Sequence, residues 1–316
     1  MKAFALTAPD QPAALTDLPD PELPSDGALV RVRAASVNGF DVHQASGGLT
    51  AMMPHELPTI VGRDLAGVVM AVGTDRTDVA VGDEVLGFVT IAPPLHSGTW
   101  SQLVTGGADL ILARKPAGIG WEAAAAIPLA ASTALDAVDA VDPKPGDTVL
   151  IMGGTGGVGA FAIQFAAQRK ARVIATARPG DDDAFVRSLG ASETIDWTQS
   201  GLGDTVRRLA PDGLAALIDV VSQAEAFMAL AALVQEGGRA STTLGAADVA
   251  ALAERGVLAT NVMGTPTADK LGALAEQAAA GTLQVPIQQT FPLADAPWAI
   301  QAFSAGTRGK LVLIVD

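Results

Sequence analysis

From residue 123 onward, short apolar runs alternate regularly with amphipathic segments. Helical patterns separate the runs, which have the length of buried strands. The runs lie near Val149, Val173, Thr194, Leu217, Arg239 and Leu258. An alternation of strand and helix is typical of a parallel sheet covered by helices on both faces. The pattern therefore predicts an α/β domain with a doubly wound parallel sheet over residues 119–265.

Before residue 118 the hydrophobic pattern changes to a period of two. In the segment 28–37, Val30 and Val32 share one face and Arg31 and Arg33 share the other, as in a half-buried strand. Similar segments punctuated by glycine follow at intervals along this half of the chain. We expect a compact antiparallel or barrel-like β domain over residues 1–118.

The C-terminal segment 266–316 contains one pattern of each kind. Residues 269–280 have a helical pattern, and the tail KLVLIV at 310–315 has the composition of a buried strand. A strand without a partner sheet is not stable in water. We therefore expect segment 266–316 to return to the β domain and pair there.

A glycine-rich turn follows the apolar run 149–152 directly. Gly154, Gly156 and Gly159 satisfy G-x-G-x-x-G between this strand and an amphipathic helix, and a second apolar strand comes next. Such glycines allow backbone N–H groups at a helix N-terminus to approach a pyrophosphate. The turn therefore predicts an anionic nucleotide ligand, with NAD, NADP, FAD and S-adenosylmethionine as the choices. The predicted contacts are Gly154, Thr155, Gly156, Gly157 and Val158.

The end of the second strand favours NADPH among these ligands. Thr176 and Arg178 stand where an NAD-binding unit would place an acidic residue on the ribose 2′-hydroxyl. A cation at that position suits a 2′-phosphate. NADH stays open as an alternative, because Asp181, Asp182 and Asp183 follow within one turn and could reach a ribose hydroxyl.

Composition and charge narrow the class of protein. A net charge of −14 argues against nucleic acid and anionic membranes as partners, because both are polyanions. No apolar run is long enough to span a bilayer, and the N-terminus lacks a signal-peptide pattern, so we expect a cytoplasmic location. The chain has no cysteine and no tyrosine. Thiolate zinc sites, thiol nucleophiles and phenolic proton donors are therefore excluded.

Several motifs in order along the chain carry a family resemblance. They are ASVNGFDVHQASG at 35–47, PTIVGRDLAGVVMAVG at 58–73, VGDEVLG at 81–87, IPLAASTA at 127–134, PGDTVLIMGGTGGVGAFAIQFA at 145–166 and GKLVLIV at 309–315. The chain resembles a zinc-independent medium-chain dehydrogenase/reductase of the NADPH:quinone oxidoreductase type. The resemblance implies a GroES-like catalytic domain, a Rossmann domain, an active cleft where the two meet and a homodimer through Rossmann edge strands.

The same resemblance implies roles for individual residues. It places Asn38 and Thr133 near nicotinamide and substrate, with Asn38 as a hydrogen-bond donor to an oxyanion. Asp41 would orient its neighbours, and His43 would donate to a substrate carbonyl. His96 could line the substrate entrance. Further cofactor contacts are expected at Trp197, Val221, Leu244, Gly245, Met263 and Lys310. Trp100 and Trp298 are expected in the core.

The sequence differs from the zinc-dependent branch of this superfamily at two positions, and these differences indicate the expected chemistry. That branch places a cysteine where Asn38 stands and a histidine where Arg63 stands, so we expect no metal site. Without metal or phenol, reduction of a conjugated acceptor is easier than oxidation of a simple alcohol. We expect hydride transfer from NADPH to a quinone or an α,β-unsaturated carbonyl. The alternatives are an enoyl reductase acting on a biosynthetic or carrier-bound intermediate and a non-catalytic NADPH-binding protein.

Overall fold

The structure, a computed structural model, describes residues 1–9 and 11–316 and divides into two compact units. Unit 1 combines Met1–Leu129 with Pro266–Asp316, and unit 2 is Ala130–Thr265. The first stretch of unit 1 therefore runs past residue 118, where the change of pattern placed the boundary. The reason is helix α2 (Trp121–Ala126), which packs on strands β3 and β5 of unit 1.

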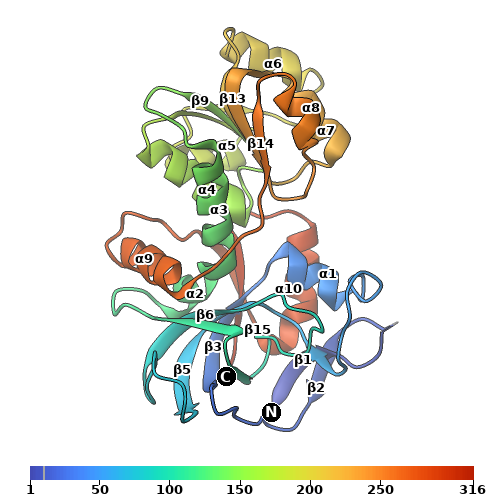
Figure 1. The fold of residues 1–316 in the computed structure, drawn as a ribbon, viewed down its shortest axis with the longest axis vertical. Helices are drawn as coiled ribbons and strands as arrows, with labels where there is room; N and C mark the ends of the chain where they lie inside the picture. The colour runs from blue at the N-terminus through green and yellow to red at the C-terminus, as the bar shows by residue number, and fades with distance from the viewer. Residues whose placement is uncertain (10) are drawn as a thin grey trace. The chain divides into compact units, whose positions relative to one another are not determined.

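Unit 1 is built on two sheets (Figure 1). A seven-stranded sheet has the order β15-β16-β3-β5-β6-β8, with β7 also paired to β3, and a three-stranded sheet has the order β2-β1-β4. The strands are β1 (Lys2–Leu6), β2 (Ala14–Asp17), β3 (Ala28–Ser36), β4 (Thr59–Ile60), β5 (Asp64–Val72), β6 (Glu84–Val89), β7 (Leu103–Gly106), β8 (Leu110–Arg114), β15 (Ile287–Pro292) and β16 (Lys310–Ile314). The other helical elements are α1 (Gly39–Ala45), α9 (Ala268–Ala279), the 3₁₀ turn η1 (Leu293–Asp295) and α10 (Ala296–Ser304).

The C-terminal segment completes the large sheet of unit 1. Strand β16 pairs antiparallel with β3 and parallel with β15, so it lies inside the sheet and not at its edge. Val30, Val32 and Leu313 lie in the core of this unit together with Trp100, which is fully buried. Trp298 is 63% exposed, and its expected core position is wrong. Helix α10 instead turns the small side chains of Ala296 and Ala299 inward.

Unit 2 is a six-stranded, all-parallel sheet, which confirms the predicted doubly wound domain. The strand order is β11-β10-β9-β12-β13-β14, so the order of strands reverses between β9 and β12. The strands are β9 (Thr148–Met152), β10 (Arg172–Thr176), β11 (Glu193–Ile195), β12 (Leu214–Asp219), β13 (Val234–Thr242) and β14 (Leu258–Asn261). The helices are α3 (Pro128–Val141), which begins in unit 1, α4 (Gly157–Gln168), α5 (Asp181–Ser188), α6 (Leu202–Leu209), α7 (Ala224–Ala231) and α8 (Val249–Ala253).

Strand β9 marks the expected ligand-binding edge of unit 2. Ligands of open α/β sheets bind at the carboxyl ends of the strands, near the point where the strand order reverses. Strand β9 lies at that point and leads into the glycine turn.

Within the residues that the structure describes, no helix is long and apolar enough to cross a membrane.

Candidate functional site

The glycine turn of unit 2 requires glycine at two positions. Gly153 has a φ of +79°, a left-handed conformation that favours glycine, although it lies outside the G-x-G-x-x-G spacing. A Cβ at Gly159 would come within 2.1 Å of the Gly153 carbonyl oxygen, so no larger residue fits there. The Thr176 hydroxyl accepts the Gly153 N–H at 2.9 Å. Thr176, predicted as a cofactor contact, therefore also holds the turn in place.

Helix α4 begins at Gly157, with Gly156 as its N-cap. No side chain in the described part of the chain caps this N-terminus. The first N–H groups of a helix have no partner within the helix, and the helix dipole places partial positive charge there. Gly154 to Val158 therefore form the kind of cradle that suits a phosphate group.

Exposed apolar side chains follow the carboxyl ends of four strands of this sheet. They are Trp197 after β11 (56% exposed), Val221 after β12 (52%), Leu244 after β13 (47%) and Met263 after β14 (81%). All four were predicted as cofactor contacts. A group of exposed apolar side chains at one edge of a sheet often marks a ligand-binding surface. The aromatic rings and riboses of a dinucleotide would cover these side chains. Gly245, also predicted, has a φ of +67° beside Leu244.

Asp219 is a site residue that the sequence analysis missed. It ends β12 beside Met152, the last residue of β9, and is fully buried. Its Oδ1 accepts the backbone N–H groups of Val221 and Ser222 at 3.0 and 2.8 Å. Asp219 thus shapes the turn that carries Val221. The available signal was an acidic residue at the end of the otherwise apolar strand LAALID.

Thr133 lies in helix α3, and the structure places it against the segment that follows β14. A Cβ on Gly264 would come within 2.0 Å of the Thr133 hydroxyl oxygen. Thr133 is 7% exposed and therefore close-packed there. Gly264, which immediately follows Met263, was not predicted. Its absence of a side chain is what allows Thr133 and the Met263 segment to meet.

Arg178 follows β10 at the same edge of the sheet. Its side chain is 59% exposed, and its Nε donates to the buried carboxylate of Asp182 at 2.6 Å. Of the three acidic residues that kept NADH open as an alternative, one therefore binds the arginine itself.

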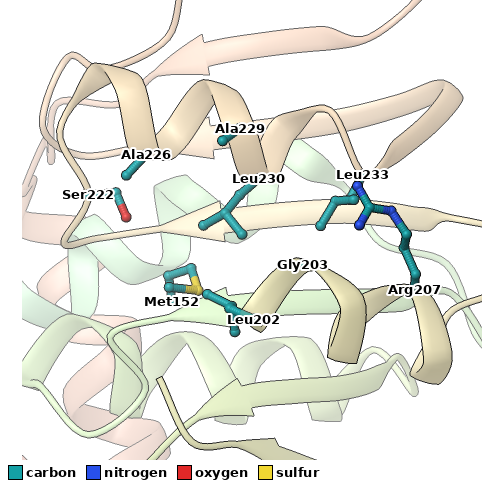
Figure 2. Close-up of a pocket in the computed structure, with 9 residues that line it drawn as sticks. All are labelled: Met152, Leu202, Gly203, Arg207, Ser222, Ala226, Ala229, Leu230 and Leu233. Atoms are coloured by element: carbon teal, nitrogen blue, oxygen red, sulfur yellow. The ribbon is translucent and has the colours of Figure 1, made fainter. Parts of the chain in front are cut away.

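Unit 2 also contains a cavity of about 400 Å³ between α6 and α7. Figure 2 shows Leu202 and Leu230 facing each other across it, with Met152 and Ser222 at one end and Arg207 at the other. Its lining includes none of the predicted cofactor contacts. Two of its lining residues, Met152 and Ser222, directly adjoin Gly153 and Val221 in the chain, so one end of the cavity borders the glycine turn and its rim.

In unit 1, Asn38 lies at the centre of a buried polar cluster. Its Nδ2 donates to Asp64 Oδ2 at 2.9 Å and to Asp41 Oδ2 at 3.1 Å, while its Oδ1 accepts from Lys310 Nζ at 2.5 Å. All of these side chains are less than a tenth exposed. An amide has only two N–H groups. Both of them face carboxylates, so neither is directed at a bound acceptor.

The cluster balances two carboxylates against two cations. Arg63, 1% exposed, donates from Nη2 to Gln44 Oε1 at 3.0 Å, and its guanidinium lies 5.4 Å from the centre of the Phe40 ring. The Lys310 ammonium also donates to the Val37 carbonyl at 3.0 Å and is enclosed within unit 1. Lys310, predicted as a cofactor contact, thus holds Asn38.

Asp41 is one of three cluster residues, with Gln44 and Arg63, that have a buried polar atom without a hydrogen-bond partner among the described residues. It stands at the third position of α1, where its Oδ2 accepts the Asn38 backbone N–H at 2.9 Å. Its Oδ1 is buried and has no hydrogen-bond partner among the described residues. Burial, together with the nearby Asp64 carboxylate, raises the pKa of Asp41 to about 7. A group with this pKa exchanges its proton near neutral pH.

The histidines do not join the cluster. His43 is exposed in the last turn of α1, where its ring lies against Gly48. His96 is exposed, and its Nδ1 lies 3.3 Å from the Pro94 carbonyl oxygen. No group of three or more His, Cys, Asp or Glu side chains among residues 1–9 and 11–316 could hold a metal ion.

Comparisons with known proteins agree with this architecture. Residues 24–105 match the family model "Alcohol dehydrogenase GroES-like domain", and residues 189–313 match "Zinc-binding dehydrogenase". The structure of the quinone oxidoreductase from Coxiella burnetii is similar, with a TM-score of 0.87 and 28% identity over 100% of this chain and 99% of that one.

Two oxidoreductases are similar to this chain in sequence. The chloroplastic NADPH-dependent alkenal/one oxidoreductase of Arabidopsis thaliana is 32% identical over 72% of this chain, which spans 57% of that protein's length. The human mitochondrial NAD(P)H oxidoreductase RTN4IP1 is 32% identical, with 91% of this chain and 81% of that protein covered. The chain belongs to the medium-chain dehydrogenase/reductase superfamily, among its proteins of the quinone oxidoreductase type.

Proposed function

We propose that the protein transfers hydride from NADPH to a quinone or an α,β-unsaturated carbonyl. The observation that carries the proposal is the carboxyl edge of the unit 2 sheet. The glycine turn, the exposed side chain of Arg178 and four exposed apolar side chains follow neighbouring strands at this edge. The names of relatives agree with it, since one is an NADPH-dependent alkenal/one oxidoreductase and a structural neighbour is a quinone oxidoreductase.

The residues of unit 2 fit the cofactor. Gly153 and Gly159 leave the turn free of side chains, so backbone N–H groups and the α4 N-terminus can hold the pyrophosphate. Trp197, Val221 and Leu244 offer apolar cover, and Arg178 offers a cation to the 2′-phosphate. Bound NADPH would supply a hydride from nicotinamide C4.

Conjugated acceptors can be reduced without a metal ion or a phenol. Hydride addition to such an acceptor spreads negative charge over the conjugated system, which neutral donors can stabilise without a metal. We assign Asn38 a positioning role, because its amide N–H groups donate to Asp41 and Asp64. Thr133 and His43 remain proposed contacts of nicotinamide and substrate.

We propose further that turnover needs no metal. The carboxylates that could bind a cation already lie beside Lys310 and Arg63, whose fixed charges would repel a divalent ion. Exhaustive dialysis against EDTA should leave NADPH consumption unchanged. A loss of activity that zinc restores would contradict this proposal.

The function is tested directly by following NADPH at 340 nm with a panel of quinones, enones and simple aldehydes. We expect turnover with the conjugated acceptors and none with the saturated aldehydes. If the protein binds NADPH but none of the acceptors leads to its consumption, the protein is instead a non-catalytic NADPH binder. Cytoplasmic location and a homodimer remain proposals, testable by cell fractionation and by light scattering.

A further inference from the structure

We propose that Asp182 is a specificity-determining residue that positions Arg178 for the 2′-phosphate of NADPH, and that Asp196 opposes this preference. The inference deepens the proposed function and rests on it. It concerns the choice between two cofactors that differ by one phosphate group. The evidence is the way in which the guanidinium of Arg178 is held.

A guanidinium has two edges that can each meet an oxyanion. One edge is formed by Nε and one Nη, and the other is formed by the two Nη groups. In Arg178 the Nε donates to Asp182 Oδ2 at 2.6 Å, and neither Nη makes a hydrogen bond to a described residue. The outer edge is therefore available to a second anion while the inner edge stays fixed.

Two arginines close to Arg178 in the sequence, Arg172 in β10 and Arg187 in α5, are held differently. Arg172 donates to Glu193 from Nε and Nη2 and to the Leu209 carbonyl from Nη1. Arg187 donates to Asp183 from Nε and uses both Nη groups on the loop and strand nearby. Their guanidinium groups are occupied by protein oxygens on both edges. Arg178 is anchored on one edge only.

The anchor itself is rigid. The Asp182 side chain is 9% exposed and lies in the first turn of α5, while the Arg178 side chain is 59% exposed. A free arginine stem loses much rotamer freedom when it binds a ligand. Fixing Nε in advance removes part of that loss, so Asp182 should strengthen phosphate binding although it carries a negative charge.

Asp196 is a second acidic residue whose charge acts on Arg178, and it can be compared with Asp182. It directly follows Ile195, which pairs with Thr176 at the end of β10, so Asp196 and Arg178 leave neighbouring strand ends, and after Asp182 the Asp196 charge contributes to raising the pKa of Arg178. Its Oδ1 accepts from the backbone N–H and hydroxyl of Thr198, so it does not hold the guanidinium. A phosphate bound to Arg178 would feel Asp196 only as a repelling charge. Asp182 and Asp196 therefore have opposite effects on NADPH affinity.

The experiment compares Asp182→Asn with Asp196→Asn, since each removes one negative charge near the same arginine. NADPH and NADH are titrated by fluorescence, and 2′,5′-ADP is titrated against 5′-AMP by calorimetry to isolate the 2′-phosphate. We expect Asp182→Asn to weaken NADPH and 2′,5′-ADP about 3- to 10-fold and to leave NADH and 5′-AMP within about 2-fold. Asp196→Asn should tighten NADPH about 2- to 3-fold.

An Arg178→Ala background shows whether Asp182 acts through the arginine. There, Asp182→Asn should no longer weaken NADPH, because no guanidinium remains to be positioned. Thermal melting of each variant verifies that it is folded, and Asp182→Ser gives a second variant if Asp182→Asn unfolds. Tightening of NADPH by both single substitutions would overturn the inference and leave the proposed function intact. A wild type that binds neither cofactor would overturn both.

Discussion

The side chain of Asn38, which stays a predicted site residue, is oriented differently from the expectation. Its place in the VNGFD motif suggested a donor to a substrate oxyanion. The structure instead directs both N–H groups at Asp41 and Asp64 and its carbonyl at Lys310. These partners are up to 272 positions away in the sequence. No local spacing could reveal them, because the contacts arise only when β3, β5 and β16 pair.

Lys310→Met should destabilise the protein by about 3–5 kcal/mol, because it leaves buried carboxylates without one of their cations. The matched control is Lys2→Met, which removes the exposed pair with Asp17 and should change the free energy of unfolding by less than about 1 kcal/mol. Urea denaturation of both variants measures the difference. Equal effects would contradict the view that the Lys310 ammonium stabilises the cluster.

Asp41 should make stability depend on pH. Its pKa rises from 3.8 in the unfolded chain to about 7 in the folded protein, so the folded state retains a proton that the unfolded state releases between these values. Stability should therefore fall as pH rises from about 4 to about 7 and level off above. Asp41→Asn should flatten that part of the curve, by at most about 4 kcal/mol. Parallel curves for wild type and variant would show that Asp41 does not titrate there.

At the level of elements, the repeating strands and helices were predictable because burial follows a period. Each predicted strand of unit 2 was found. What escaped prediction depends on packing between elements. Trp298 lies outward because α10 buries its alanines, and the left-handed residue of the nucleotide turn is Gly153, one position before the motif.

The glycine turn supplies a sharp test of an element. Gly159→Ala should destabilise unit 2 by about 3 kcal/mol or more and weaken NADPH binding, because the new Cβ would collide with the Gly153 carbonyl. The control is Gly272→Ala in α9, where a Cβ meets nothing within 4 Å. There alanine should stabilise the helix by up to about 1 kcal/mol. Chemical denaturation and cofactor titration should separate the two variants; similar losses in both would count against the collision.

At the scale of the whole molecule, strand β14 bears on assembly. Among the described strands it pairs with β13 alone, at the outer edge of the unit 2 sheet (Figure 1), and its Leu258 is 61% exposed. An exposed apolar edge strand is a ready surface for pairing with a second copy. We therefore expect this edge to form the proposed homodimer.

If the proposed dimer forms through this edge, Leu258→Lys should give a monomer near 31.9 kDa, since it places a charge where two copies would bury an apolar side chain. Trp298→Lys, at a residue of similar exposure in unit 1, should leave the dimer intact. Size-exclusion chromatography with light scattering measures both masses. A dimer that persists in Leu258→Lys would place the interface elsewhere.

The position of β16 inside the sheet of unit 1 constrains how the protein can be made. Unit 2 is continuous in sequence, so it can fold while synthesis proceeds, whereas the large sheet of unit 1 lacks an interior strand until residues 310–314 have left the ribosome. Until then Asn38, Asp41 and Asp64 have no lysine to pair with. Nascent chains halted before residue 310 should therefore carry a protease-sensitive N-terminal half beside an already resistant nucleotide-binding unit.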